Sequence, residues 1–346
     1  MGWAISSRDG EQASDLAREW LVQMCDNTLH VDAYEPYLEE LTNPRQAPAD
    51  IGPSVSQILP DQNASPLTTE IAVRRLKQAL PDPTRRIEVS DLVDGETQRL
   101  AARIADTARH PLGGTPFADQ RAAYEEETAV SACLLATGVF HGDEMHAPLW
   151  IRSLQRLISA RRPITGSFNG PTEAMRHYPA LLCLWAMGIG AILADRENLL
   201  ARFLTEPTWT PIFGKPEPQP AVRCLNPNRI VVVADDVVGD GRPWLYPQSH
   251  HMRTVSRGTL RQIEPDDDTY QGACDRLEYL ASLIAMDTDG PNGLPWVGEF
   301  MMRDRPHEQA PKFRSLLDGG AFGSDAERAQ TAGKALNTWI TQHPTF

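Results

Sequence analysis

Apolar residues recur at helical spacing along most of this chain. The 3.6-residue period predicts helices over 14–25, 31–44, 68–80, 89–108, 118–140, 149–160, 178–194, 197–204, 269–287 and 327–342. Proline-rich stretches interrupt the pattern at 44–66 and 205–229 and mark two boundaries. The pattern predicts a mainly α, multi-helical fold of stacked helical hairpins.

These boundaries divide the chain into three parts. We expect N-terminal helices with a proline-rich linker in 1–64, a central helical domain in 65–210 and a C-terminal helical domain in 221–346. The C-terminal part contains the one β signal, RIVVVADDVVGDGRPWLY at 229–246, where two β-branched runs surround an Asp-Gly turn dipeptide. The sequence predicts a small β-hairpin there.

The segment YPALLCLWAMGIGAILA, residues 178–194, contains no charge over seventeen residues. A membrane span needs roughly twenty apolar residues, so this run is at the lower edge of that range. Charges flank it on both sides and indicate no orientation. The segment predicts a buried central helix rather than a membrane helix.

Composition limits the partners. With 33 Lys and Arg against 46 Asp and Glu, the formal net charge is −13, which repels phosphate backbones, so we expect no nucleic-acid partner. Five cysteines without CxxC pairing predict reduced thiols in a cytoplasmic protein. The short basic groups are predicted to be solvated helix faces: Arg74, Arg75, Lys77, Arg85, Arg86, Arg161 and Arg162.

The densest group of potential metal ligands is HGDEMH, which supplies His141, Glu144 and His146. On a helix the two histidines diverge by about 140°, unlike the i,i+4 pair of HExxH, and Gly142 indicates a helix end. A polar loop is therefore the first interpretation. The alternative is a metal-dependent hydrolase or nuclease in which these three residues join Asp235, Asp236 or the His250-His251 pair.

Other motifs predict no catalytic residue and no cofactor. The chain has no GxxxxGK[ST] phosphate loop and no G-x-S-x-G nucleophile elbow. The run Glu125-Glu126-Glu127 is typical of a solvated helix face. A further alternative is a small-molecule sensor for a nucleotide signal, with a pocket lined by four aromatic residues: Trp150, Tyr178, Trp185 and Trp244.

Three segments resemble a known group of proteins. They are RLKQALPDPTRRIEVSDLVDGETQRL (75–100), HYPALLCLWAMGIGAILADRENLLARFL (177–204) and CDRLEYLASLIAMD followed by WVGEFMMR (274–287, 296–303). In this order they resemble the helical C-terminal regions of actinobacterial proteins associated with antiphage defence, which carry Schlafen-type or sirtuin-like effector domains at the front. The resemblance covers about residues 65–305. Residues 1–64 do not correspond to such an effector domain, so no catalytic activity or catalytic residue is carried over.

The resemblance implies a helical sensor, scaffold or oligomerisation module. Together with the absence of a complete catalytic motif, it favours a non-catalytic scaffold, sensor or regulatory subunit of a bacterial defence system. Such a subunit acts with a separately encoded effector. We therefore expect a protein partner or self-association.

Overall fold

The computed structural model describes residues 69–106, 109–110, 115–160, 170–210, 217–231, 245–290, 293–302 and 313–343. The chain divides into two units, Met1–Ala64 and Ser65–Phe346, and all described residues belong to the second. The helices predicted over 14–25 and 31–44 lie outside them. The described part is 79% helical and confirms the mainly α fold class.

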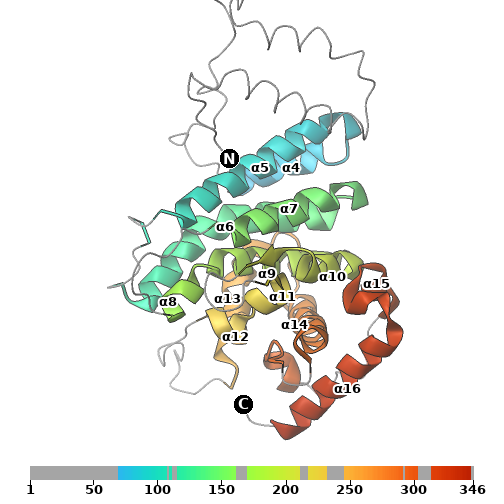
Figure 1. The fold of residues 1–346 in the computed structure, drawn as a ribbon. Coiled ribbons are helices and arrows are strands. Elements are labelled where there is room, and N and C mark those ends of the chain that lie inside the picture. The colour runs from blue at the N-terminus through green and yellow to red at the C-terminus, as the bar shows by residue number, and fades with distance from the viewer. Residues whose placement is uncertain are drawn as a thin grey trace, which may run out of the picture. The chain divides into compact units, whose positions relative to one another are not determined.

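The described part contains thirteen α-helices (Figure 1). They are α4 (Thr69–Ala79), α5 (Arg86–Ile104), α6 (Phe117–His141), α7 (Ala147–Ile158), α8 (Gly170–Met175), α9 (Tyr178–Leu193), α10 (Glu197–Thr205), α11 (Ala221–Cys224), α12 (Pro227–Ile230), α13 (Pro247–Leu260), α14 (Asp267–Asp289), α15 (Phe313–Asp318) and α16 (Ala326–Gln342). Short 3₁₀ turns stand at Pro83–Arg85, Glu144–His146, Glu299–Met302 and Ala321–Ser324.

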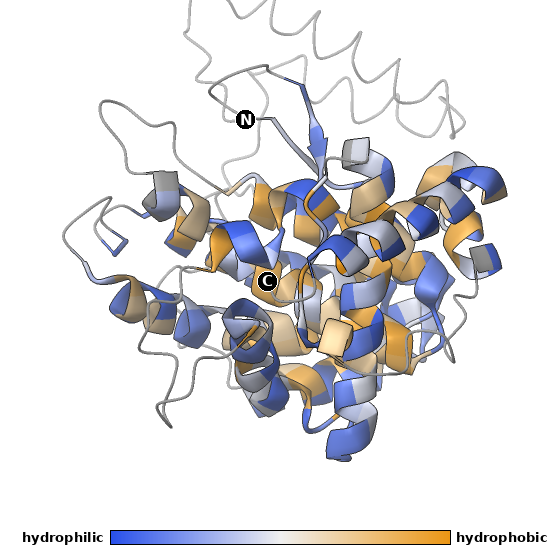
Figure 2. Ribbon diagram, turned by 90° about the horizontal axis from the view of Figure 1, so that it is seen from below, coloured by the Kyte–Doolittle hydropathy of each residue, from blue (hydrophilic) through white to orange (hydrophobic). Residues whose placement is uncertain are grey.

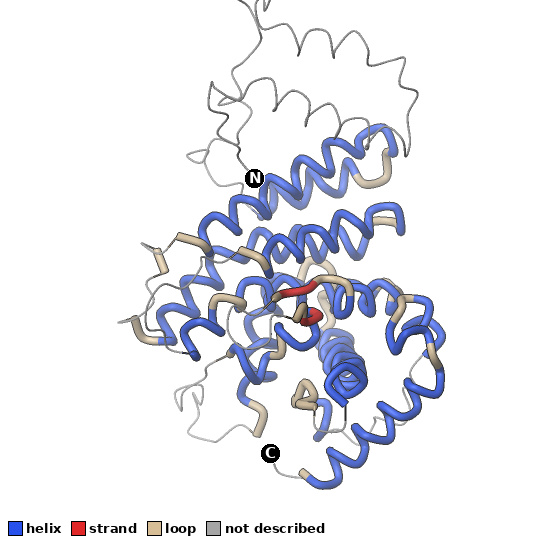
Figure 3. Tube along the Cα trace, in the orientation of Figure 1, coloured by secondary structure: helices blue, strands red, loops and turns tan. Residues whose placement is uncertain are grey.

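Strands are confined to one small antiparallel pair in the described residues, β1 (Thr208–Trp209) with β2 (Gln219–Pro220) (Figure 3). The hairpin predicted near 229–246 is wrong at its start, because Arg229 and Ile230 belong to α12. Asn226 caps that helix by accepting a hydrogen bond from the Asn228 backbone N–H, and Pro227 occupies its first position. Residues 232–244 lie outside the described part, so the rest of the hairpin stays a prediction.

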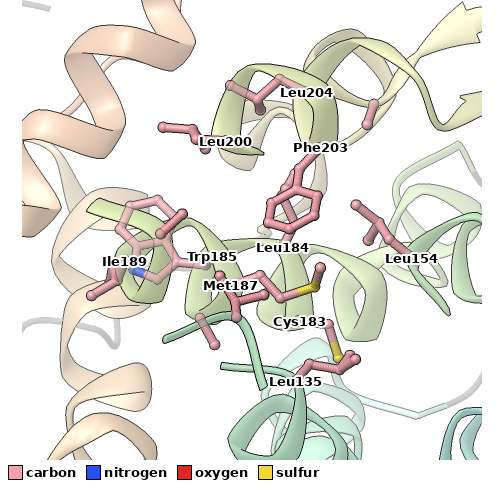
Figure 4. Close-up of a cluster of buried hydrophobic side chains, with 14 of the residues drawn as sticks. Leu135, Leu154, Cys183, Leu184, Trp185, Met187, Ile189, Leu200, Phe203 and Leu204 are labelled. Atoms are coloured by element: carbon pink, nitrogen blue, oxygen red, sulfur yellow. The ribbon is translucent and has the colours of Figure 1, made fainter. Parts of the chain in front are cut away.

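Helix α9 forms the centre of the core, as its uncharged sequence predicts. Every residue from Tyr178 to Ala191 is buried, and α9 packs against α6, α7, α10, α13 and α14. Figure 4 shows Leu184 and Met187 of α9 among side chains contributed by α6, α7 and α10. The indole of Trp185 stacks on that of Trp296, with centroids 6.3 Å apart. Helices from both the 65–210 and the 221–346 segments therefore share this core.

The described helices include none that is both long and apolar enough to cross a membrane. Those at the periphery bury one stripe only. In α4 the buried residues Ala72, Val73, Leu76 and Ala79 follow helical spacing, while Arg74 and Arg75 are exposed. Figure 2 shows this change between hydrophobic and hydrophilic residues along the helices.

Glycine allows α6 and α9 to approach closely. A Cβ at Gly190 would be 2.9 Å from the carbonyl oxygen of Ala136 on α6. On α6 itself, a Cβ at Gly138 would overlap the indole ring of Trp150 from α7. Helix α6 therefore contacts α9 at Gly190 and α7 at Gly138, two positions where no side chain fits.

Candidate functional site

Helix α13 is held by charged contacts. Its sequence, PQSHHMRTVSRGTL, has few apolar residues, and its buried residues include the polar Ser249, Arg253 and Ser256. It packs against α6, α9, α12 and α14. Its basic side chains meet carboxylates from three other segments, and this meeting point is the candidate functional site.

The first part of the site joins α6, α9 and α13. Tyr178 donates a hydrogen bond from its hydroxyl to Glu125 Oε1 at 2.7 Å. His251 Nε2 lies 2.9 Å from the same oxygen and 2.8 Å from the Tyr178 hydroxyl. Because the carboxylate only accepts and the tyrosine proton is directed to it, His251 Nε2 must carry a proton. Both donors therefore converge on one oxygen of Glu125.

Burial and charge set the protonation states of this group. Burial raises the pKa of the Glu125 carboxyl, but the hydrogen bonds from His251 and Tyr178 outweigh it and hold the pKa below its ordinary value of 4.5. Burial and the adjacent Glu125 carboxylate raise the pKa of Tyr178 well above 10.0. At neutral pH the site therefore holds an ionised carboxylate and a protonated tyrosine.

A small cavity opens beside Glu125, between α6, α9 and α13. Its volume is about 20 Å³. It is lined by Glu125, Thr128, Ala129 and Ala132 of α6, Leu182 and Ala186 of α9, and Val255, Ser256 and Thr259 of α13. This space suffices for roughly one water molecule or one group of that size.

The second part of the site surrounds Arg253. Its guanidinium lies 2.7 Å from Asp275 and 2.5 Å from Glu278 on α14, and 3.7 Å from Glu299. Arg253 and Glu278 are almost wholly buried. Glu278 also accepts a hydrogen bond from the Ser249 hydroxyl, and a Cβ at Gly298 would overlap its carboxyl group. Burial raises the pKa of Glu278, although the nearby Arg253 lowers it.

The three residues of the predicted metal site face different partners. His141 is exposed at the end of α6, and Glu144, also exposed, lies 3.7 Å from Arg202. His146 is buried, with Nδ1 2.6 Å from Asp143 and its ring stacked on Trp150. In the part of the chain that is described, no group of three His, Cys, Asp or Glu residues is placed to hold a metal ion. The geometry therefore gives the metal alternative no support.

The structure describes some, but not all, of the other candidate residues that the sequence predicted. Trp150 and Trp185 are buried in the core, and Tyr178 contacts Glu125 at the cavity. His250 and His251 point to different carboxylates, Glu299 and Glu125. Asp235, Asp236 and Trp244 lie outside the described residues.

Replacing Glu125 by glutamine should weaken the dependence of the unfolding free energy on pH. A carboxyl whose pKa is lowered by folding stabilises the protein above its unfolded pKa, and this stabilisation is lost as the pH falls through the folded pKa. We expect the Glu125→Gln variant to lose about 1–3 kcal/mol of unfolding free energy at pH 7, and the deficit to shrink towards pH ~3. Urea titrations across this range measure it. A deficit that stays constant with pH would contradict the assignment, and Glu126→Gln, on the exposed side of α6, is the matched control.

No protein-family model, curated protein or solved structure matches this chain.

Proposed function

We propose that this chain is a non-catalytic helical scaffold, sensor or regulatory subunit. In this role it binds a protein partner or a second copy of itself, in the cytoplasm. The proposed setting is bacterial antiviral defence, with a separately encoded effector performing the chemistry.

One observation carries this proposal: buried charged side chains form ion pairs that join one helix to another. Arg253 on α13 holds Asp275 and Glu278 on α14. Arg276 on α14 pairs with Glu197 on α10 at 2.8 Å, and both residues are buried. Buried pairs add little net stability compared with apolar packing, but they specify one arrangement of the elements that they join. A defined arrangement of helices is what a scaffold presents to a partner.

Two further observations support it. The resemblance of residues 65–305 to helical regions of defence-associated proteins concerns regions that accompany an effector domain. In addition, α9 joins helices from both halves of the unit Ser65–Phe346. A displacement imposed on one side of this unit can therefore reach the other through α9.

Native mass spectrometry of the full chain, purified without chelators and co-expressed with the products of neighbouring genes, tests the proposal. We expect a homo-oligomer or a complex of whole-number stoichiometry. A chain that is monomeric over a wide concentration range and binds none of these products would contradict it. A stoichiometric metal ion that is lost in His141→Ala and His146→Ala variants would favour the hydrolase alternative instead.

A further inference from the structure

Helix α16 packs chiefly against one other helix. Its buried residues Ala329, Ala332 and Leu336 lie on one stripe, and α16 packs on α14. Its other main contacts are with α15 and the 3₁₀ turn Ala321–Ser324, which directly precede it in the chain. Figure 1 shows α16 at the edge of the described helices. The surface that holds α16 therefore belongs largely to α14.

An ion pair fixes the position of α16 along α14. Arg328 donates two hydrogen bonds to the Asp287 carboxylate, from Nε at 3.0 Å and from Nη2 at 2.7 Å. Two parallel hydrogen bonds from one guanidinium require a defined geometry. The Asp287 side chain is only 13% exposed, so a like charge placed opposite it would be poorly solvated. The pair therefore distinguishes a matched contact between α14 and α16 from a mismatched one.

The turn that leads into α16 has a strained backbone. Phe322, Gly323 and Ser324 have φ angles of 57°, 60° and 61°, all in the left-handed region. Glycine adopts this region freely, whereas a side chain is crowded by the backbone there, and successive left-handed residues are rare. Phe322 and Ser324 therefore store strain in the chain reversal that returns α16 to the α14 of its own chain.

Helix α15 is fixed on the other side of this turn. It packs against α10, and a Cβ at Gly319 would overlap the backbone carbonyl oxygen of Asn198 on that helix. The chain is thus held firmly up to Gly319 and joined to α16 through strained residues. Opening of the turn would move α16 and leave α15 in place.

A second copy of the chain can satisfy the contacts of α16 when the turn opens. If two chains exchange α16, each helix packs on the α14 of the other chain through the same buried stripe and the same Arg328–Asp287 pair. The backbone at Phe322 and Ser324 can then leave the left-handed region in both chains. We propose that the protein dimerises by exchanging α16 between two copies, with Phe322–Ser324 as the hinge. The inference rests on the proposed self-association and specifies its surface.

Two full-length variants with opposite charge reversals test the exchange. Asp287→Arg places two arginines at the contact between α14 and α16, and Arg328→Glu places two carboxylates there. Each variant alone therefore has mismatched contacts, both in a closed monomer and in an exchanged homodimer. In an exchanged dimer of the two variants, native Arg328 meets native Asp287 at one contact, and the introduced glutamate meets the introduced arginine at the other. Both contacts are then matched.

Native mass spectrometry of the two variants, refolded together at equal concentrations, measures the pairing, because the variants differ in mass. We expect the ratio of mixed dimer to homodimers to exceed that of random pairing about tenfold. Random pairing would overturn the exchange, since a dimer formed through any other surface leaves the contacts between α14 and α16 within each chain. A mixture that stays monomeric at all concentrations would overturn it as well.

A hinge variant tests the strain without changing the surface between α14 and α16. Ser324 is exposed, and its hydroxyl donates a hydrogen bond to the Leu317 carbonyl oxygen at 3.0 Å. In Ser324→Val this bond is lost, and the branched side chain adopts the left-handed region less readily than serine. Both changes disfavour the closed turn. We expect the dissociation constant of the dimer to fall about tenfold in sedimentation equilibrium.

Thr331→Val is the matched control. Thr331 is also exposed, and its hydroxyl donates to the Glu327 carbonyl oxygen at 2.8 Å, but it lies within α16 rather than in the hinge. This variant should leave the dissociation constant of the dimer unchanged. An unchanged dissociation constant in Ser324→Val, or an equal fall in both variants, would overturn the assignment of the hinge.

The exchange and the proposed function can fail separately. If the wild-type chain forms an oligomer or a complex with a neighbouring gene product but the charge variants pair at random, the exchange is wrong and the function stands. A wild-type chain that is monomeric and binds none of these products would contradict both.

Discussion

Replacing Gly190 by leucine is expected to unfold the protein or cause it to aggregate. The Cβ alone would lie 2.9 Å from the carbonyl oxygen of Ala136, and that oxygen belongs to the backbone of α6, which cannot rotate away as a side chain can. The rest of the leucine side chain has no space in this contact, because α9 is buried from Tyr178 to Ala191. Overpacking of this kind should lower the unfolding free energy by at least about 3 kcal/mol, a large part of the roughly 5–15 kcal/mol of a typical domain.

Thermal unfolding followed by circular dichroism measures this effect, and Gly272 provides the matched control. Gly272 lies in helix α14, where an added Cβ meets nothing within 4 Å. Gly272→Ala should therefore stabilise the protein by up to about 1 kcal/mol through helix propensity, whereas Gly190→Ala should destabilise it. A Gly190→Leu variant that is soluble and melts as the wild type would show that α6 and α9 do not approach this closely.

Replacing Arg253 by methionine should cost about 3–5 kcal/mol of unfolding free energy. The methionine fills much of the space but leaves Glu278, which is 1% exposed, beside Asp275 and Glu299 without a balancing charge. Burial already raises the pKa of Glu278, and loss of Arg253 removes the strongest of the groups that lower this pKa. A carboxyl whose pKa is raised by folding destabilises the protein above that pKa, so the deficit should shrink as the pH falls and Glu278 takes up a proton.

Urea unfolding at pH 7 and at about pH 5 measures this prediction. The double variant Arg253→Met, Glu278→Gln should recover part of the lost stability, because it removes the uncompensated charge. Arg74→Met is the surface control. Its pair with Glu70 is exposed, at 63% and 80%, and should contribute at most about 1 kcal/mol. Equal stabilities of Arg253→Met and Arg74→Met would contradict the structural role of the buried network.

The helices with strong apolar periodicity could be predicted from the sequence. The prediction for 178–194 agrees with α9 at Tyr178–Leu193 and with its burial. Asp266 caps α14 through a hydrogen bond from the Thr269 backbone N–H, which agrees with the acidic residues at that helix start. The helix predicted over 89–108 is instead α5 at Arg86–Ile104, and Ser90 lies inside it, where its hydroxyl donates a hydrogen bond to Asp94. Local patterns therefore identified the helices better than their ends.

Helix α13 and its contacts could not be predicted in this way. Its stabilisation comes from ion pairs and hydrogen bonds, which leave no apolar period in the sequence. Its partners are distant: Glu125 and His251 are 126 residues apart. The run Glu125-Glu126-Glu127 was predicted to be a solvated face, yet Glu125 bonds His251 and Glu127 bonds His110, and only Glu126 is exposed. Only the tertiary fold distinguishes these three neighbouring carboxylates.

The close contact between α6 and α9 has a mechanical consequence. Because backbone meets backbone at Gly190 and Ala136, α9 cannot slide along α6 at this point without a steric clash. The two helices, of 25 and 16 residues, are therefore expected to move as one unit. An axial displacement of either helix should therefore carry the other helix with it.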